Sequence, residues 1–209
     1  MNDSEIYHMS HVLRGSLQTA LLNVQAVAVT LGRDDDAQAS IRVAREELLR
    51  AGRMLVAAFD IVSLELGDVQ RVNLRTLAAR ALAESGVDGV TLSRGPWPDV
   101  VGDARLLRLA IGQLAANACA ATPAEARRPE IHASGKRGSV ALEVRDWGRG
   151  FGAVTPPGRA FTASRPDHVA TGLLTAQRIA RLHRGTLSFA SSPGGTTVSL
   201  ALPRARRAR

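Results

Sequence analysis

The feature that most constrains the fold of this sequence is an apolar repeat that runs through its first third. Its positions recur at alternating steps of three and four residues, and all but Ser10 are apolar: Ile6, Ser10, Leu13, Leu17, Ala20, Val24, Val27 and Leu31. A mean step of 3.5 residues is typical of helices that pack side by side in a left-handed bundle. Gly32 and three aspartates end this run, and a second run extends from Ala37 to Leu66. Residues 3–66 are therefore predicted to form a hairpin of two helices, each about 45 Å long.

A hairpin of two helices cannot enclose an apolar core by itself. Met54, Phe59 and Ile61 lie beside the second repeat and would stay in contact with water in a single hairpin. Pairing of two hairpins into a four-helix bundle would bury these side chains, so we expect the protein to form a homodimer. The alternative is that the same face packs against the second half of the chain.

The pattern changes near residue 72 to short segments separated by turn signals. The sequence predicts a helix that ends near Glu84, a strand at 90–92, a helix at 103–120, strands at 130–133 and 140–144, a loop rich in glycine and proline at 148–169, a helix at 172–183, and strands at 185–190 and 196–202. Helices that alternate with pairs of strands indicate an α/β sandwich, in which the helices cover one face of a mixed sheet.

We therefore assign the chain to the α+β class. A helical hairpin at 1–68, forming half of a dimeric four-helix bundle, is followed by an α/β sandwich at 69–209. Only 3% of the residues are aromatic, so the core must be built mainly from leucine, valine and alanine.

The composition argues against several classes of protein. Cys119 is the only cysteine, so no disulfide can form within the chain. No apolar stretch approaches the roughly 20 residues that a membrane span needs, and the N-terminus has no signal-peptide pattern, so we expect a cytoplasmic protein without a membrane segment. The net charge is +8, but the arginines are scattered and the one dense basic run is the C-terminal tail. We expect a solvated arginine-rich surface and no nucleic-acid partner, although nucleic-acid binding stays open as a distant alternative.

Three short stretches of the second half could carry chemistry. Asn117 lies in a helix rich in alanine and leucine, and its amide oxygen could coordinate Mg²⁺. Asp146 follows a predicted strand, where its carboxylate could accept a hydrogen bond from the exocyclic amine of adenine, and Gly148 and Gly150 would let backbone approach a ligand. Gly172 begins a helix whose free N–H groups could hold phosphate. Each stretch alone also has an ordinary structural explanation: a surface asparagine, a β-turn and a helix start.

The order and spacing of these stretches resemble the sensor histidine kinases of two-component signalling, which carry an ATPase domain of the GHKL type. Asn117 matches the N box of that family, Asp146, Gly148 and Gly150 match its D-x-G-x-G box, and Gly172 matches the second glycine of its G-L-G-L box. The flanking sequence also agrees, with V-G-D-A-R-L at 101–106, Phe161 before the last box, and G-G-T-T at 194–197 before Leu202 and Pro203.

This resemblance implies that the second half of the chain binds ATP and Mg²⁺. The residues that it assigns to nucleotide binding are Asn117, Asp146, Gly148, Gly150, Gly172 and Thr197. Asn117 would also hold the metal ion.

The stretch M-S-H-V-L-R-G-S-L at 9–17 resembles the H box of the same family, S-H-E-L-R-T-P-L. Ser10 lies on the helical seam and His11 lies one position outside it, so we expect the imidazole to face water. A neutral imidazole has an unprotonated nitrogen that can attack the γ-phosphoryl group of ATP. The resemblance implies that His11 is the catalytic phosphoacceptor. The phosphoryl group would then pass to an aspartate in the receiver domain of a response regulator.

The sequence departs from the boxes of the family at six positions: Val12, Gly15, Ser16, Gln113, Ala120 and Ala170. Val12 replaces an acidic residue that would assist the imidazole, and acid–base assistance contributes about 10²- to 10⁴-fold in rate. Ala120 replaces a lysine near the phosphates, and Ala170 adds a methyl group where backbone should approach them. Two hypotheses therefore stay open: an ATP-dependent histidine kinase, and a non-catalytic phosphotransfer protein or pseudokinase scaffold of the same fold.

Overall fold

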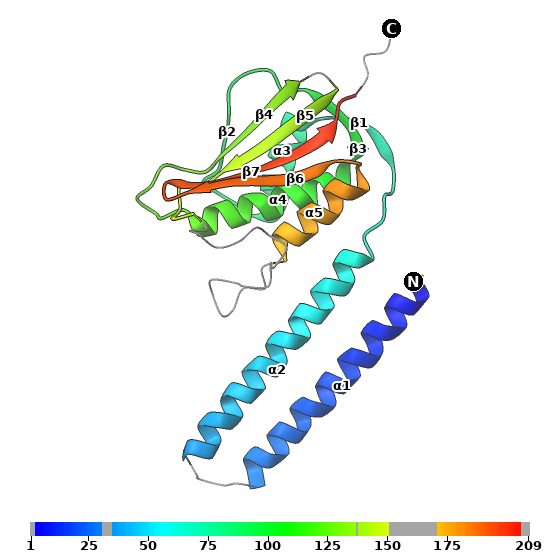
Figure 1. Cartoon of the computed structure of the whole chain (residues 1–209), viewed down its shortest axis with the longest axis vertical. Coiled ribbons are helices and arrows are strands. Elements are labelled where there is room, and N and C mark those ends of the chain that lie inside the picture. Colours follow the sequence, from blue (N-terminus) through cyan, green and yellow to red (C-terminus); the bar gives the residue numbers. More distant parts are fainter. Residues whose placement is uncertain (1–2, 31–34, 137, 151–170, 206–209) are drawn as a thin grey trace. The chain divides into compact units, whose positions relative to one another are not determined.

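The computed structural model describes residues 3–30, 35–136, 138–150 and 171–205 (Figure 1). The chain divides into two compact units, of which the first includes the residues up to Ser63 and the second begins at Leu64. No helix within the described ranges has both the length and the apolar character that crossing a membrane requires.

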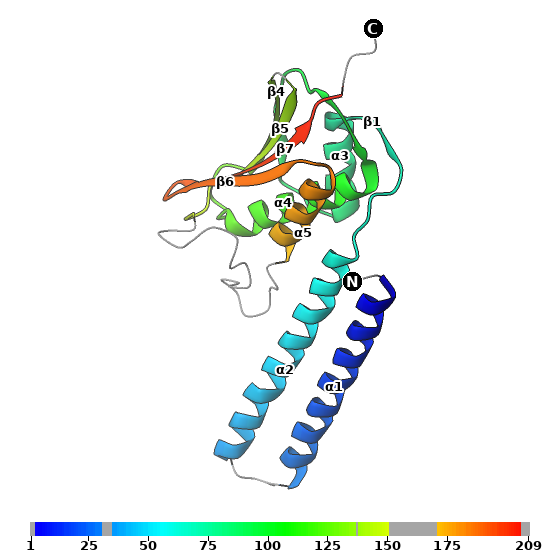
Figure 2. The same cartoon turned by 45° about the vertical axis from the view of Figure 1, so that its right-hand side comes forward.

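The first unit is built from two helices, α1 (Asp3–Thr30) and α2 (Asp35–Val62), which lie side by side (Figures 1 and 2). Each helix has 28 residues, so the predicted hairpin of two long helices is confirmed. The side-chain amide of Gln38 donates a hydrogen bond to the carbonyl oxygen of Ala28 over 2.7 Å and joins the two helices near their connection.

The hairpin leaves much of its apolar surface accessible to water. Within this unit, none of the side chains that the structure describes is buried, and Leu22, Val29 and Val43 are 62%, 83% and 61% exposed. Residues of both helices line an open hollow of about 350 Å³: Asn23, Val24, Val27, Ser40, Ile41 and Ala44. A single hairpin therefore encloses no core among its described residues, as the apolar repeat predicts.

The second helix is shorter than its repeat predicts. It ends at Val62, so the prediction that it continues to Leu66 is wrong. Leu64 packs instead against the apolar core of the second unit, and the backbone N–H of Gly67 donates to the carboxylate of Asp103 over 2.8 Å. These two contacts hold the segment 64–67 on the second unit in a non-helical conformation.

The second unit is an α/β sandwich, which confirms the predicted fold class (Figure 1). Its main sheet, within the described ranges, has the strand order β2-β4-β5-β7-β6. These strands are β2 (Thr91–Leu92), β4 (Glu130–Lys136), β5 (Ser139–Arg145), β6 (Thr186–Ser192) and β7 (Gly195–Pro203). β2 pairs in parallel with β4, and the other neighbours pair antiparallel. One face of the sheet is covered by three helices: α3 (Leu74–Ser85), α4 (Ala104–Ala121) and α5 (Gly172–Leu182).

A second, two-stranded sheet was not predicted from the sequence. It pairs β1 (Val69–Asn73) with β3 (Asp99–Asp103) in antiparallel register, so that Val72 lies opposite Val100. Val69 is 47% exposed, and Gly102 interrupts the apolar pattern of β3. Gly102 is needed there because an added Cβ would lie 2.7 Å from Cδ2 of His183.

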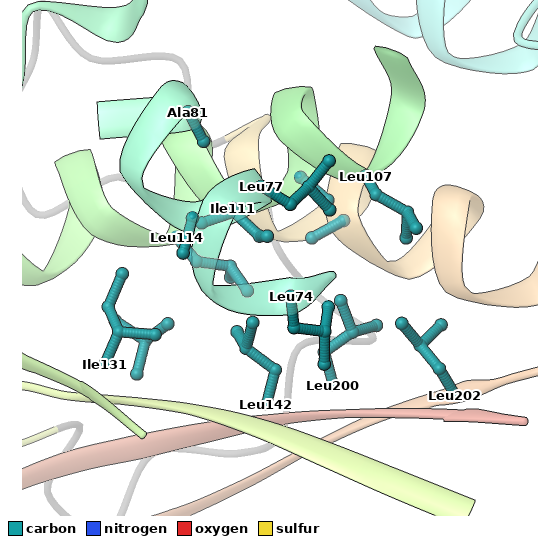
Figure 3. Packing of buried hydrophobic residues seen from close by; sticks show 14 of the residues in the cluster. Leu74, Leu77, Ala81, Leu107, Ile111, Leu114, Ile131, Leu142, Leu200 and Leu202 are labelled. Carbon is teal, nitrogen blue, oxygen red and sulfur yellow. The ribbon is translucent and has the colours of Figure 1, made fainter. Parts of the chain in front are cut away.

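The core of the second unit lies between the three helices and the main sheet (Figure 3). It contains Leu74, Leu77, Ile111 and Leu114 from the helices and Ile131, Leu142, Leu200 and Leu202 from the strands. Burying one such side chain stabilises the fold by about 1.5–3 kcal/mol. This packing fixes α4, the helix that carries Asn117, against the main sheet, whose strand β5 directly precedes Asp146.

Candidate functional site

Asp146 lies directly after β5 and is only 8% exposed. Its Oδ1 accepts two backbone hydrogen bonds, from the N–H of Gly148 over 2.9 Å and from the N–H of Thr196 over 3.0 Å. Its own N–H donates to the carbonyl oxygen of Thr196 over 2.8 Å. Among the described residues no donor reaches Oδ2. The carboxylate is therefore held in place through one oxygen and can accept a hydrogen bond from a ligand through the other.

The two glycines after Asp146 allow close approaches of backbone. A Cβ at Gly148 would lie 2.6 Å from the carbonyl oxygen of Ala121, the last residue of α4. Gly150 has a φ of 68°, and a Cβ there would meet the carbonyl oxygen of Ser192. The turn that begins at Asp146 therefore contacts both the end of α4 and the turn between β6 and β7.

Asn117 lies on α4 against the N-terminus of α5. A Cβ at Gly172 would lie 2.8 Å from Nδ2 of Asn117 and 2.9 Å from Oε1 of Gln113, so both side-chain amides contact the first residue of α5. Neither amide has a hydrogen bond to another described residue, and both residues are partly exposed. Amide oxygens are acceptable ligands for Mg²⁺, which binds few protein groups and takes its remaining ligands from phosphate and water. Asn117 therefore fits the metal-binding role implied for it.

The two threonines at the start of β7 lie on opposite faces of the sheet. Thr196 is 4% exposed and shares its face with the buried residues Val198 and Leu200, whereas Thr197 is partly exposed on the other face. The structure therefore brings Thr196 to Asp146, and it does not bring the predicted Thr197 there. The apolar alternation at 198, 200 and 202 is the sequence signal that could have identified Thr196.

Asp103 caps the N-terminus of α4, where its Oδ1 accepts from the N–H groups of Arg105 and Leu106 over 2.9 and 3.1 Å. Burial by itself raises the pKa of this carboxyl, but the hydrogen bonds from the N–H groups of Gly67, Leu106 and Arg105, together with the Arg105 charge, outweigh burial and hold the pKa below its ordinary value of 3.8.

His183 joins this cap to α5. Its Nε2 accepts a hydrogen bond from the N–H of Asp103 over 2.9 Å, and its Nδ1 lies 2.8 Å from the carbonyl oxygen of Ile179. Because the first bond makes Nε2 the acceptor, the ring proton lies on Nδ1 and is donated to Ile179. α4 and α5 are thus fixed to each other at the ends opposite Asn117 and Gly172.

The segment that follows the hairpin is also attached to these helices. Arg178 of α5 donates through Nη2 to the carbonyl oxygen of Leu64 over 3.3 Å, and Arg105 of α4 donates to that of Glu65 over 3.4 Å. With the bond from Gly67 to Asp103, the segment 64–67 contacts both helices that form the site.

The residues of the H box lie in the first unit. His11 is on α1, and its side chain and that of Val12 lie outside the described residues. Phe161 and Ala170, from the boxes of the second half, also lie outside them. Across the parts of the chain that the structure describes, no group of three or more histidine, cysteine, aspartate or glutamate residues could hold a metal ion.

A comparison with protein families decides the identity of the second unit. The profile of the family described as "Histidine kinase-, DNA gyrase B-, and HSP90-like ATPase" matches residues 102–206. The chain belongs to this family. The match includes all of the nucleotide-site residues predicted from the sequence, from Asn117 to Thr197, in one ATPase domain.

Several solved structures similar to this ATPase domain come from sensor histidine kinases, which confirms the resemblance to that group. The ATP-binding domain of PrrB from Mycobacterium tuberculosis is 28% identical, with a TM-score of 0.52, and the match covers 67% of this chain and all of that domain. The mycobacterial sensor histidine kinase MprB is 22% identical, with a TM-score of 0.54, over 66% of this chain and 98% of the MprB chain.

Full-length ShkA, solved in complex with AMPPNP, shares the fold of the whole chain. Its identity is 21% and its TM-score is 0.63, and the match covers 100% of this chain but only 47% of ShkA. No curated protein sequence matches this chain significantly.

Proposed function

We propose that this chain is the core of an ATP-dependent protein histidine kinase, which phosphorylates His11 and passes the phosphoryl group to an aspartate of a response regulator. The observation that carries the proposal is the arrangement of Asp146, whose Oδ1 is held by two backbone N–H groups while Oδ2 has no donor among the described residues. The exocyclic amine of adenine is a complementary donor. A hydrogen bond to a charged group contributes about 1.5–3 kcal/mol.

The phosphate end of the nucleotide would lie at Asn117 and the N-terminus of α5. Free N–H groups in the first turn of α5 can bind phosphate oxygens. When bound, Mg²⁺ neutralises negative charge on the phosphates. Asn117 would hold this ion, with the Gln113 amide beside it. The exposed residue Ala120 supplies no cation, so the helix end and the metal ion would have to balance more of the phosphate charge than with a lysine at this position.

In the proposed reaction a ring nitrogen of His11 attacks the γ-phosphorus of ATP. The new N–P bond forms as the bond from the γ-phosphorus to the bridging oxygen breaks, and ADP leaves with that electron pair. Val12 can neither accept a proton nor orient the imidazole ring. We therefore expect self-phosphorylation to be about 10²- to 10⁴-fold slower than with a carboxylate at this position.

The second candidate is a phosphotransfer protein or pseudokinase scaffold of the same fold. Val12 and Ala120 favour it, because the first removes acid–base assistance and the second removes a cation from the phosphate end. Oδ2 of Asp146 and the amide of Asn117, neither of which has a hydrogen-bond partner among the described residues, favour the kinase, because a protein that does not bind nucleotide has no need of either group.

Incubation of the whole chain with γ-labelled ATP and Mg²⁺ separates the two candidates. The kinase predicts label on the wild type and none on a His11→Gln variant that still binds nucleotide. Asp146→Asn should lose both label and nucleotide binding, because the new amide would present an N–H group to the adenine amine. Absence of label together with absence of nucleotide affinity would favour the phosphotransfer protein. Label that persists in His11→Gln would contradict the assignment of the phosphoacceptor.

The partners in this proposal are a second copy of the chain and the receiver domain of a response regulator. Dimerisation through the hairpin is supported by the absence of buried side chains among its described residues. Val27 is 49% exposed and lines the hollow between α1 and α2. Light scattering should give the mass of a dimer for the wild type and of a monomer for Val27→Glu, with Gln25→Glu, at an exposed polar position of α1, as the matched control. A monomeric wild type would contradict the dimer.

A further inference from the structure

One residue outside the sequence motifs connects two of them. Thr122 follows α4, and its hydroxyl donates to the carbonyl oxygen of Ala118 over 2.8 Å while it accepts from the backbone N–H of Trp147 over 3.3 Å. Ala118 directly follows Asn117, and Trp147 directly follows Asp146. A single hydroxyl therefore bridges the helix that carries the candidate metal ligand and the turn that carries the candidate purine ligand.

The surroundings of this hydroxyl keep the helix and the turn in contact. Gly148 lies against the carbonyl oxygen of Ala121 with no room for a Cβ, so the turn rests directly on the end of α4. The indole Nε1 of Trp147 donates to the carbonyl oxygen of Arg128 over 3.1 Å, which ties the loop after α4 to the same turn. Thr122 is also the C-cap of α4: its backbone N–H completes the last helical hydrogen bond, to the carbonyl oxygen of Ala118, and its extended conformation, with φ −82° and ψ 124°, ends the helix.

We propose that Thr122 is a positioning residue of the nucleotide site, whose hydroxyl fixes the distance between the helix at Asn117 and the turn at Asp146. The inference rests on the proposed function, since a nucleotide must reach both groups at once. A ligand that spans two binding groups gains from both only when their separation is set before it binds. Thr122 therefore lets purine recognition and metal recognition reinforce each other without touching the nucleotide.

Two substitutions test this role. Thr122→Val keeps the shape of the side chain and removes the hydroxyl, whereas Thr122→Ser keeps the hydroxyl. Calorimetry on the whole chain with AMPPNP, with Mg²⁺ and with EDTA, should show that the valine variant loses about fivefold to tenfold in affinity with Mg²⁺. The serine variant should stay within about twofold of the wild type, as expected if the hydroxyl is what matters. The factor by which Mg²⁺ raises the affinity should be smaller in the valine variant, which general destabilisation would not produce.

The possible failures are distinguishable. A wild type that does not bind AMPPNP overturns the proposed function and this inference with it. If the wild type binds AMPPNP, this inference alone is overturned by either of two results: the valine variant binds as tightly as the wild type, or the serine variant binds as weakly as the valine variant. If the valine variant does not fold, amide hydrogen exchange at Trp147 in the wild type and in Thr122→Ser decides. The inference predicts protection that increases with Mg²⁺ and AMPPNP, and exchange at the rate of an unprotected amide would overturn it.

Discussion

The contact between Gly172 and Asn117 predicts how a single added methyl group would act on the site. In Gly172→Ala the new Cβ would lie 2.8 Å from Nδ2 of Asn117, so the amide must retreat by about 0.6 Å to reach the 3.4 Å at which ordinary van der Waals contact begins. Mg²⁺ requires ligands at 2.0–2.1 Å in near-ideal octahedral geometry, so a displacement of this size removes the amide as a ligand. Disturbing a group that positions a metal ligand typically lowers metal affinity by about 10- to 100-fold.

Overpacking and helix propensity act in opposite directions on the stability of this variant. Inserting a methyl group into a packed site costs about 1–3 kcal/mol, while alanine is favoured over glycine by about 1 kcal/mol in a helix interior and by less at Gly172, the first residue of α5. We therefore expect the affinity for Mg²⁺-bound ADP to fall by about 10- to 100-fold with only a small change in the free energy of unfolding.

Calorimetry with ADP, in Mg²⁺ and in EDTA, and urea unfolding measure these effects. The loss of affinity should be largest in Mg²⁺. Gly135→Ala is the matched control, because an added Cβ there would meet its nearest neighbours at an ordinary 3.6 Å and its φ is not positive. Equal affinities of Gly172→Ala and the wild type in Mg²⁺ would show that Gly172 does not hold a metal-binding amide in place.

Three further predictions concern the second unit. The pKa of Asp103 is held below 3.8, so the ionised carboxylate stabilises the fold fully above that pH, and this stabilisation is lost as the pH falls through the lowered pKa. Between pH 5 and pH 3 the free energy of unfolding in urea should therefore fall less in Asp103→Asn than in the wild type, and an equal fall in both would contradict the assignment. Gly148→Ala should lower the free energy of unfolding by about 1–3 kcal/mol, because its Cβ would meet a backbone oxygen, and unchanged unfolding in urea would be inconsistent with that contact. Thr197→Val should leave the AMPPNP affinity within about twofold of the wild type, because Thr197 lies on the face of the sheet opposite Asp146. A tenfold loss of affinity, measured by calorimetry, would show that Thr197 contributes to nucleotide binding after all.

The main elements of the fold could be predicted because their sequence patterns are local. The apolar repeat fixes both long helices, and alternating apolar residues fix the longer strands of the main sheet. The end of α2 could not be predicted in this way, because the repeat continues to Leu66 while the helix ends where Leu64 joins the core of the second unit. β1 and β3 were missed because neither has a regular apolar alternation: β1 is exposed apart from Val72, and β3 begins and ends with an aspartate and contains Gly102.

The residues of the candidate site also divide into those that the sequence could predict and those that it could not. Asp146, Gly148, Gly150 and Asn117 stand out in short motifs whose chemistry is visible in the sequence. Thr122 acts through contacts that only the fold creates, since 25 residues separate it from Trp147. The bond between His183 and Asp103 spans 80 residues and could not be inferred from either neighbourhood.

The proposed function requires that Asp146 and Asn117 hold the two ends of one magnesium-bound nucleotide. Calorimetric titration of the whole chain with AMPPNP, beside Asp146→Asn and Asn117→Ala, tests it most directly. The wild type should bind, each variant should lose at least about tenfold in affinity in Mg²⁺, and the loss in Asn117→Ala should largely disappear in EDTA. A wild type without affinity, or an Asn117→Ala variant whose loss is the same with and without Mg²⁺, would contradict it.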